Sequence, residues 1–178
     1  MKTLRHGGLL MAAAVNLLLA SAQSRTLVLT SNGRTDYRIV IARDASGIDR
    51  RAAEELRDHL QRISGAALTI VSDDSPPQDR EILIGKSRRL EGMVPMIPLE
   101  ELGEDGFLIR TSGGKLVIAG GKDKGPLYGV YAFLEDSLGC RRYAKDVLIT
   151  PRRPTIRVGP IDRKEIPFFS YREVLMPD

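Results

Sequence analysis

The sequence has no tryptophan, a single cysteine and only two histidines among its 178 residues. Cys140 has no second cysteine for an internal disulfide, so we interpret it as a buried thiol, with intermolecular pairing as a minor alternative. A metal site needs several His, Cys or carboxylate ligands that converge, and the motif H-E-x-x-H does not occur. His59 is interpreted as a surface side chain among charged neighbours. The sequence therefore predicts no metal site and no nucleophile paired with a histidine base.

Aromatic residues make up only 5% of the chain, so the predicted core is aliphatic. A carbohydrate-binding module usually displays a platform of exposed aromatic rings, and this composition offers few candidates for one. The chain also lacks a strong excess of positive or negative charge, because 27 Lys and Arg residues stand against 23 Asp and Glu residues. So small an excess, dispersed along the chain, does not favour a nucleic-acid partner.

Phosphate-binding motifs are incomplete. Gly120 and Gly125 have the separation of a Walker loop, but Pro126 and Leu127 stand where its lysine and hydroxyl residue are required. The motif G-x-G-x-x-G does not occur in this stretch either. We therefore predict no nucleotide and no other cofactor, and we interpret these glycines as a turn that lets a helix start close to a sheet.

Carboxylates occur mostly as neighbouring doublets, such as Asp73-Asp74 and Glu100-Glu101. A glycosidase needs two carboxylates that face each other across about 5 to 10 Å, and adjacent side chains point apart. We interpret the doublets as solvated charge, and the sequence predicts no catalytic residue. Lys122 and Lys124 are weak candidates for binding a substrate carboxylate, with a solvated loop as the alternative.

Residues 1–22 have the pattern of a secretory signal peptide. A basic stretch, "MKTLRHGG", precedes the apolar "LLMAAAVNLLLA", and Ala20, Ser21 and Ala22 suit signal peptidase. The apolar run is shorter than the roughly 20 residues that cross a bilayer, so no stable membrane span is expected. We predict export to the periplasm or the extracellular space, with an uncleaved interfacial anchor as the alternative.

Strand and helix patterns fill the rest of the chain. Ser46 is the predicted N-cap of a helix, with Asp49 three residues later, and Gly65 is its predicted left-handed C-cap. Asp123–Gly139 is a second predicted helix, with Tyr128 and Tyr131 expected in the core. The predicted strands are residues 26–30, 37–42, 68–72, 81–85, 107–111, 115–119, 140–144, 146–150 and 155–159.

These elements predict an α/β fold of the α+β sandwich type, in which helices pack on a mixed β-sheet. Gly113 and Gly114 favour a tight hairpin between two of the strands. The segment 86–104 contains two prolines and little periodicity, so we expect it to be irregular.

The final residues include three aromatic side chains where a domain should already be complete. Phe168, Phe169 and Tyr171 would leave apolar area exposed to water unless another surface covers them. They are our candidates for a domain-docking surface. The alternative is that they complete the core of this domain.

The order of several segments resembles a known family. These are "YRIVIARDASGIDRRAAEELRDHLQRISGAALTI", "EILIGKS", "DGFLIRTSGGKLVIAGG", "KGPLYGVYAFLEDSLGCRRY" and "PFFSYRE". Together they resemble the N-terminal domain of α-glucuronidases and of related secreted bacterial glycoside hydrolases. The same domain type precedes the catalytic barrel of β-N-acetylhexosaminidases. This sequence departs from the family pattern at three positions. Lys124 stands where relatives often have arginine, Pro126 follows Gly125, and Tyr143 stands where relatives often have tryptophan.

The resemblance implies a non-catalytic accessory domain whose partner in cis is a (β/α)8 catalytic barrel, absent from this chain. After the predicted signal peptide (1–22), it implies two parts: the accessory domain (23–164) and the start of the barrel (165–178). The implied polysaccharide is xylan that carries uronic-acid side chains, and the resemblance implies that the barrel, not this domain, binds it. A stand-alone carbohydrate-binding or interaction module of the cell envelope is the alternative.

Overall fold

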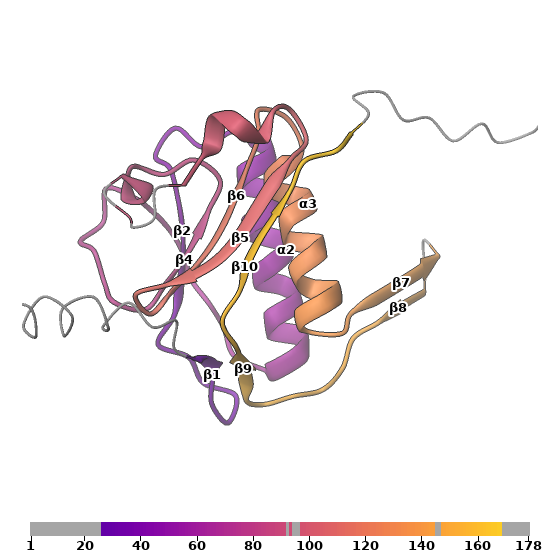
Figure 1. The fold of residues 1–178 in the computed structure, drawn as a ribbon. Coiled ribbons are helices and arrows are strands. Elements are labelled where there is room, and N and C mark those ends of the chain that lie inside the picture. The colour runs from indigo at the N-terminus through magenta and orange to yellow at the C-terminus, as the bar shows by residue number, and fades with distance from the viewer. Residues whose placement is uncertain (1–25, 92, 94–96, 145–146, 169–178) are drawn as a thin grey trace, which may run out of the picture.

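The computed structural model describes residues 26–91, 93, 97–144 and 147–168. Its centre is a six-stranded mixed sheet ordered β10-β5-β6-β4-β2-β3, with two helices on one face (Figure 1). The strands of this sheet are β2 (Arg38–Ile41), β3 (Ile70–Ser72), β4 (Glu81–Ile84), β5 (Phe107–Ser112), β6 (Lys115–Gly120) and β10 (Asp162–Glu165). The helices are α2 (Gly47–Ser64) and α3 (Gly125–Ala132), which continues into the π-helical turn η4 (Phe133–Ser137). The predicted fold class is confirmed.

Parallel and antiparallel pairs are segregated within the sheet. Strands β3, β2, β4 and β6 are parallel neighbours, whereas β5 pairs antiparallel with β6 and β10 pairs antiparallel with β5. Gly113 and Gly114, both with positive φ, form the tight turn between β5 and β6 that the sequence predicts. No pattern in the sequence predicts β10, an edge strand that runs across residue 164, the predicted end of the accessory domain.

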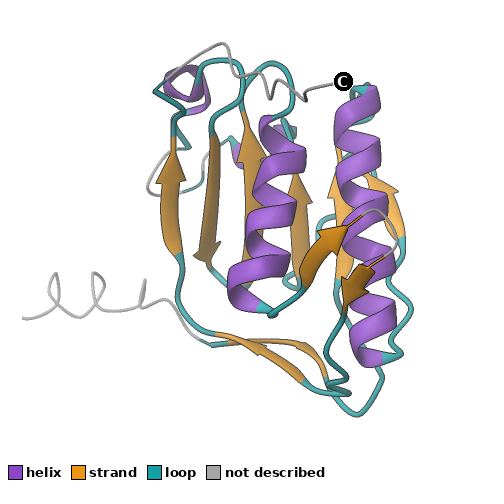
Figure 2. Ribbon diagram, turned by 90° about the vertical axis from the view of Figure 1, so that its right-hand side faces the viewer, coloured by secondary structure: helices purple, strands orange, loops and turns teal. Residues whose placement is uncertain are grey.

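Two further pairs of strands lie outside the main sheet. Strand β1 (Leu27–Thr30) pairs with β9 (Ile156–Val158), and β7 (Arg141–Ala144) pairs with β8 (Val147–Ile149). Figure 2 shows the helices in front of the sheet and the β7–β8 hairpin on that same side of the molecule. In Figure 1 this hairpin extends away from the body of the domain.

Local signals account for helix α2. The Ser46 side chain accepts a hydrogen bond from the Asp49 amide at 3.0 Å, and the Asp49 carboxylate accepts one from the Ser46 amide at 3.2 Å. Gly65 adopts the left-handed conformation at the other end, with φ of 79°. Both predicted caps are confirmed, because capping depends on residues within one helical turn.

Close packing explains the glycines around the start of α3. A Cβ atom on Gly129 would lie 2.7 Å from Cγ2 of Ile118, so α3 lies directly against the sheet. A Cβ on Gly120 would collide with the backbone of Gly125 and Pro126. The prediction that these glycines let a helix start close to a sheet is confirmed.

The sheet separates two apolar cores. The larger core lies between the sheet and the helices and includes Leu56, Ile82 and Phe133. The smaller core on the opposite face is covered by the segment predicted to be irregular, which contains two short 3₁₀ helices, η2 (Arg88–Leu90) and η3 (Leu99–Leu102). In the described ranges no helix is both long and apolar enough to cross a membrane.

Three side chains on the helices, His59, Tyr128 and Tyr131, differ from their predicted exposure. His59 is buried, with Nδ1 2.8 Å from the carbonyl oxygen of Glu55, because it lies three residues after the buried Leu56, on the flank of the apolar stripe. Tyr128 and Tyr131, predicted to lie in the core, are instead exposed on the outer side of α3. Cys140 is buried as predicted, and this burial raises the pKa of its thiol despite the nearby Arg153 and Arg141.

Candidate domain-docking surface

The loop between β6 and α3 carries Lys122 and Lys124, the two candidates for substrate binding. Both side chains are exposed to solvent. A phosphate-binding loop directs its backbone amides at the ligand, whereas amides of this loop bond to oxygen atoms of the protein itself. The Gly121 amide donates to Gly106 at 2.8 Å, and the Lys122 amide donates to Gly103 at 3.0 Å. The loop therefore does not present a phosphate cradle.

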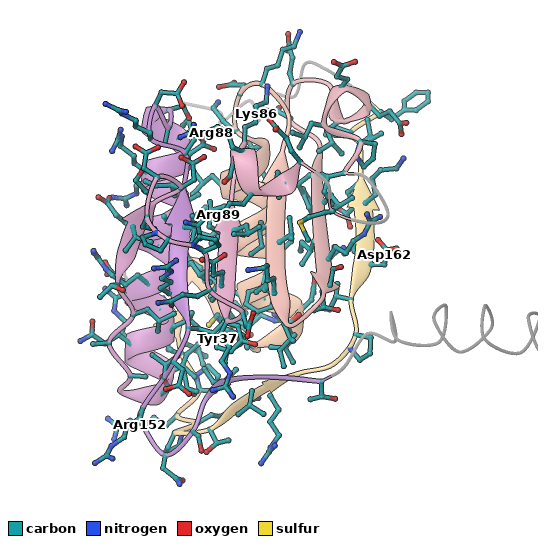
Figure 3. The ribbon with its side chains drawn as sticks, turned by 90° about the vertical axis from the view of Figure 1, so that its left-hand side faces the viewer. Tyr37, Lys86, Arg88, Arg89, Arg152 and Asp162 are labelled. Atoms are coloured by element: carbon teal, nitrogen blue, oxygen red, sulfur yellow. The ribbon has the colours of Figure 1, made fainter. Side chains whose placement is uncertain are left out.

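A buried carboxylate forms the densest charge cluster that the structure describes. Glu81 is fully buried on β4 and accepts hydrogen bonds from Arg38 at 2.7 Å and from Lys115 at 2.7 Å, as well as from Arg89. Arg38 and Lys115 lie on the two strands that flank β4, and Arg89 approaches from η2 across the sheet face seen in Figure 3. Burial acts to raise the pKa of Glu81, but the three cationic donors outweigh it and lower this pKa to about 2.

The contacts of the cluster explain its role. Arg89 also donates to the carbonyl oxygen of Ser75, Arg38 to that of Pro76, and Lys115 to that of Gln78. The cluster thus fastens the loop between β3 and β4 to the sheet. A carboxylate so strongly held in its ionised form is a poor general acid or base at neutral pH.

Asp73 differs from its neighbour Asp74, although both were interpreted as solvated. The Asp73 side chain is 1% exposed and accepts hydrogen bonds from the amides of Arg43 and Arg88, both at 3.0 Å. Burial acts to raise the pKa of Asp73, but these bonds and the Arg88 charge lower it overall. Among the described residues, no group of three or more His, Cys, Asp or Glu side chains is arranged to hold a metal ion.

Exposed apolar side chains, in contrast, gather on the last third of the described chain. Among the residues that the structure describes, eight large hydrophobic side chains are exposed, and only one of these eight, Val28, precedes α3. The other seven are Tyr128, Tyr131, Tyr143, Val147, Ile149, Ile166 and Phe168. We call these seven residues the apolar surface. Soluble domains scatter such residues singly, so their concentration on α3, on one hairpin and after β10 indicates an interaction surface.

The β7–β8 hairpin is the most exposed ordered element of this surface. Tyr143 is 70% exposed, and Val147 and Ile149 are 48% and 53% exposed. Val147 and Ile149 stand two residues apart on β8 and therefore point to the same face of the hairpin. Arg141 holds the base of the hairpin to the end of the helix by donating to the carbonyl oxygen of Glu135 at 2.8 Å.

A groove lies at the other end of α3. Its volume is about 520 Å³, and it is open to solvent. Asp105, Phe107, Tyr128, Lys164, Glu165, Ile166 and Pro167 line it. Arg163 on the adjoining strand covers the ring of Phe107, with 5.6 Å between its guanidinium carbon and the ring centroid. The groove thus joins the outer side of α3 to the chain that leaves β10.

The structure describes one of the three residues predicted to form a docking surface. Phe168 is 92% exposed beyond the groove, whereas Phe169 and Tyr171 lie outside the described residues. Sequence reasoning missed the β7–β8 hairpin as part of an interaction surface. The short apolar run at residues 147–149 signalled a strand, but only the tertiary structure shows that neither of its faces enters either apolar core.

Comparison with known proteins gives one family match. The model of the glycosyl hydrolase family 67 N-terminus matches residues 26–133, which is more than half of the chain. A probable alpha-glucuronidase A from Aspergillus clavatus is 31% identical over 83 residues, which are 47% of this chain and 10% of that protein.

Solved structures share the fold. A family GH115 4-O-methyl-alpha-glucuronidase, described as specific for decorated arabinogalactans, matches with a TM-score of 0.54 and 22% identity, over 82% of this chain and 19% of that one. The GH20 beta-N-acetylhexosaminidase from Streptomyces coelicolor A3(2) matches with a TM-score of 0.52 and 14% identity, over 86% of this chain and 26% of that one. The chain spans about a tenth to a quarter of the length of these relatives. The family match, supported by the shared fold, shows that the chain belongs to the family of glycosyl hydrolase family 67 N-terminal domains.

Proposed function

We propose that this chain is the non-catalytic N-terminal domain of an exported α-glucuronidase-like glycoside hydrolase and packs against a (β/α)8 catalytic barrel in the same polypeptide. The observation that carries the proposal is the family match over residues 26–133. The most deeply buried carboxylate among the described residues, Glu81, is engaged by three cations, which makes it a poor general acid or base. Xylan with uronic-acid side chains is the proposed polysaccharide.

Hydrolysis assays test the proposal. The complete product of the gene and the 178-residue chain are each assayed on aryl α-glucuronosides and on xylooligosaccharides that carry glucuronic acid. We expect turnover by a longer product and none by the 178-residue chain. Turnover by the 178-residue chain that a single carboxylate substitution abolishes would contradict the accessory role, as would a reading frame that encodes no barrel.

Export is part of the proposal. Residues 1–22 act as a signal peptide and direct the protein to the periplasm or the extracellular space. Amino-terminal sequencing of the protein recovered from the periplasm or the medium is expected to begin at Gln23. A protein that retains Met1 and stays with the cytoplasmic fraction contradicts export and leaves the accessory role standing.

A stand-alone carbohydrate-binding module is the second candidate. It is favoured by the exposed rings of Tyr128, Tyr131 and Tyr143, since sugar rings stack on aromatic side chains. Calorimetric titration of the 178-residue chain with xylooligosaccharides distinguishes the two candidates. Saturable binding that Tyr143→Ala abolishes would favour the module, and its absence would favour the accessory domain.

A further inference from the structure

We propose that the β7–β8 hairpin and the outer side of α3 form the interface with the catalytic part of the same polypeptide, and that this interface extends well beyond the predicted docking residues Phe168, Phe169 and Tyr171. This inference rests on the proposed function, because the occupant it names is the catalytic domain that follows in the chain.

The construction of the hairpin is the first observation. A two-stranded hairpin is at best marginally stable in water unless a face of it packs against something else. Among the described strands, β7 and β8 pair only with each other, and Tyr143, Val147 and Ile149 are all exposed. The hairpin is nevertheless fixed at its base through Arg141 and the buried Cys140. Such an element fits an arm that completes its packing on another domain.

The second observation connects the hairpin to α3. Tyr131 stands four residues before Glu135, whose carbonyl oxygen accepts the 2.8 Å hydrogen bond from Arg141 of β7. Partial burial and the Glu55 carboxylate raise the pKa of Tyr131, while Arg51 and Arg142 act in the opposite direction. Tyr128 lies one turn before Tyr131 and lines the groove together with Ile166. The apolar surface therefore continues from the hairpin to the groove.

The third observation identifies the occupant. Ile166 and Pro167 line the groove, so the described part of the chain ends beside this surface, at Phe168. A domain tethered there meets the surface at a high effective concentration, without needing a strong intrinsic affinity. The matched relatives are four to ten times longer than the segments they share with this chain, which leaves room for a large occupant.

The edge strand β10 argues for side-chain docking rather than added strands. Its residues, Asp162–Glu165, are all charged, which discourages pairing with a further strand. Lys164 is bonded to Glu101 at 2.8 Å, and Arg163 to Asp136 at 2.5 Å, so these charges are already engaged within the domain. We expect apolar side chains of the catalytic domain to contact the hairpin and enter the groove.

Hydrogen exchange measured by mass spectrometry tests the inference on the complete gene product and on the 178-residue chain. We expect the amides of residues 141–149 to exchange at least about tenfold more slowly in the complete product, because docking suppresses local opening of the hairpin. Amides of the turn at residues 31–34 are expected to exchange equally in both. Equal exchange of residues 141–149 in both proteins would overturn the inference.

A matched pair of valine substitutions supplies the second readout. Val147 on β8 and Val28 on β1 are exposed by 48% and 38%, and each lies in a two-stranded sheet. We expect Val147→Ser to lower the melting temperature of the complete product while leaving that of the 178-residue chain unchanged. Val28→Ser is expected to have the same effect in both proteins. Equal effects of Val147→Ser in both would also overturn the inference.

The failures of the inference and of the proposed function are distinguishable. A complete product that hydrolyses α-glucuronosides but leaves residues 141–149 unprotected retains the proposed function and loses this interface. A gene that encodes no catalytic domain removes the proposed function and this inference together. Sedimentation of the 178-residue chain as a dimer that Tyr143→Ala dissociates would overturn the inference in favour of a second copy as occupant.

Discussion

Two regions of this domain differ in how many large apolar side chains they expose to solvent. From β1 to β6, strands and α2 bury nearly every large apolar side chain, and Val28 is the one exposed exception among the described residues. From α3 to Phe168, seven large apolar side chains are exposed. The first region has a sheet with cover on both faces, whereas the second contributes one helix side, a hairpin and an edge strand. Apolar area left exposed in this way supports the proposed interface between the second region and another domain.

The two regions also differ in where their charged side chains lie. The first region holds a fully buried carboxylate, Glu81, within a cluster of three cations. In the second region the ion pairs are at the surface, such as Arg163 with Asp136. Buried ion pairs contribute to stability only when complete, and exposed pairs contribute little. The first region is therefore the one that substitutions should destabilise most.

The largest effect is expected from Glu81→Ala. It leaves Arg38, Arg89 and Lys115 without their shared carboxylate, and breaking a buried ion pair typically costs about 3–5 kcal/mol of unfolding free energy. Urea denaturation of the 178-residue chain measures the loss. The control, Glu100→Ala, removes an exposed carboxylate and should change stability by less than about 0.5 kcal/mol. Equal losses in the two variants would contradict a structural role for the cluster.

The same carboxylate predicts the pH dependence of stability. The folded pKa of Glu81 is about 2, below its ordinary value of 4.5, so its contribution is complete above pH 4.5 and lost as the pH falls toward 2. That difference corresponds to about 3 kcal/mol. We expect the unfolding free energy of the unsubstituted chain to fall more steeply between pH 4.5 and 2 than that of Glu81→Gln. Parallel pH profiles would show that Glu81 is not the group responsible.

An intermediate effect is expected on the inner side of α3, which is packed as tightly as the first region. Gly129→Ala places a methyl group 2.7 Å from Cγ2 of Ile118, and such overpacking costs about 1–3 kcal/mol. The higher helix propensity of alanine offsets only about 1 kcal/mol of this loss in unfolding free energy. Gly47→Ala, where a Cβ meets nothing within 4 Å, serves as the control in thermal denaturation. Stabilisation by Gly129→Ala would show that α3 does not lie so close to the sheet.

The smallest effect is expected on the apolar surface. Ile149→Ser in the 178-residue chain should change the unfolding free energy by less than about 0.5 kcal/mol, because Ile149 is 53% exposed and belongs to neither apolar core. Urea denaturation measures it alongside Ile82→Ala, a fully buried position of the first region with an expected loss of about 2–5 kcal/mol. A loss of more than 1 kcal/mol for Ile149→Ser would remove the contrast between the two regions.

Local signals by themselves determined much of this fold. The caps of α2 at Ser46 and Gly65 and the glycine turn of the β5–β6 hairpin require only residues within a few positions of each other. The prediction that Gly120 and Gly125 bring a helix close to a sheet follows from the same kind of signal. Such features are encoded where they occur, so a single sequence predicts them.

Only the tertiary structure decided the rest. The partners of Glu81 stand 43, 34 and 8 residues away along the chain, and no local pattern unites them. The burial of His59, the exposure of Tyr128 and Tyr131 and the pairing of β10 with β5 likewise depend on which elements become neighbours. The periodicity of a helix shows which side chains share a face. Packing against the sheet determines which of those faces is buried, and here it leaves the outer side of α3 exposed.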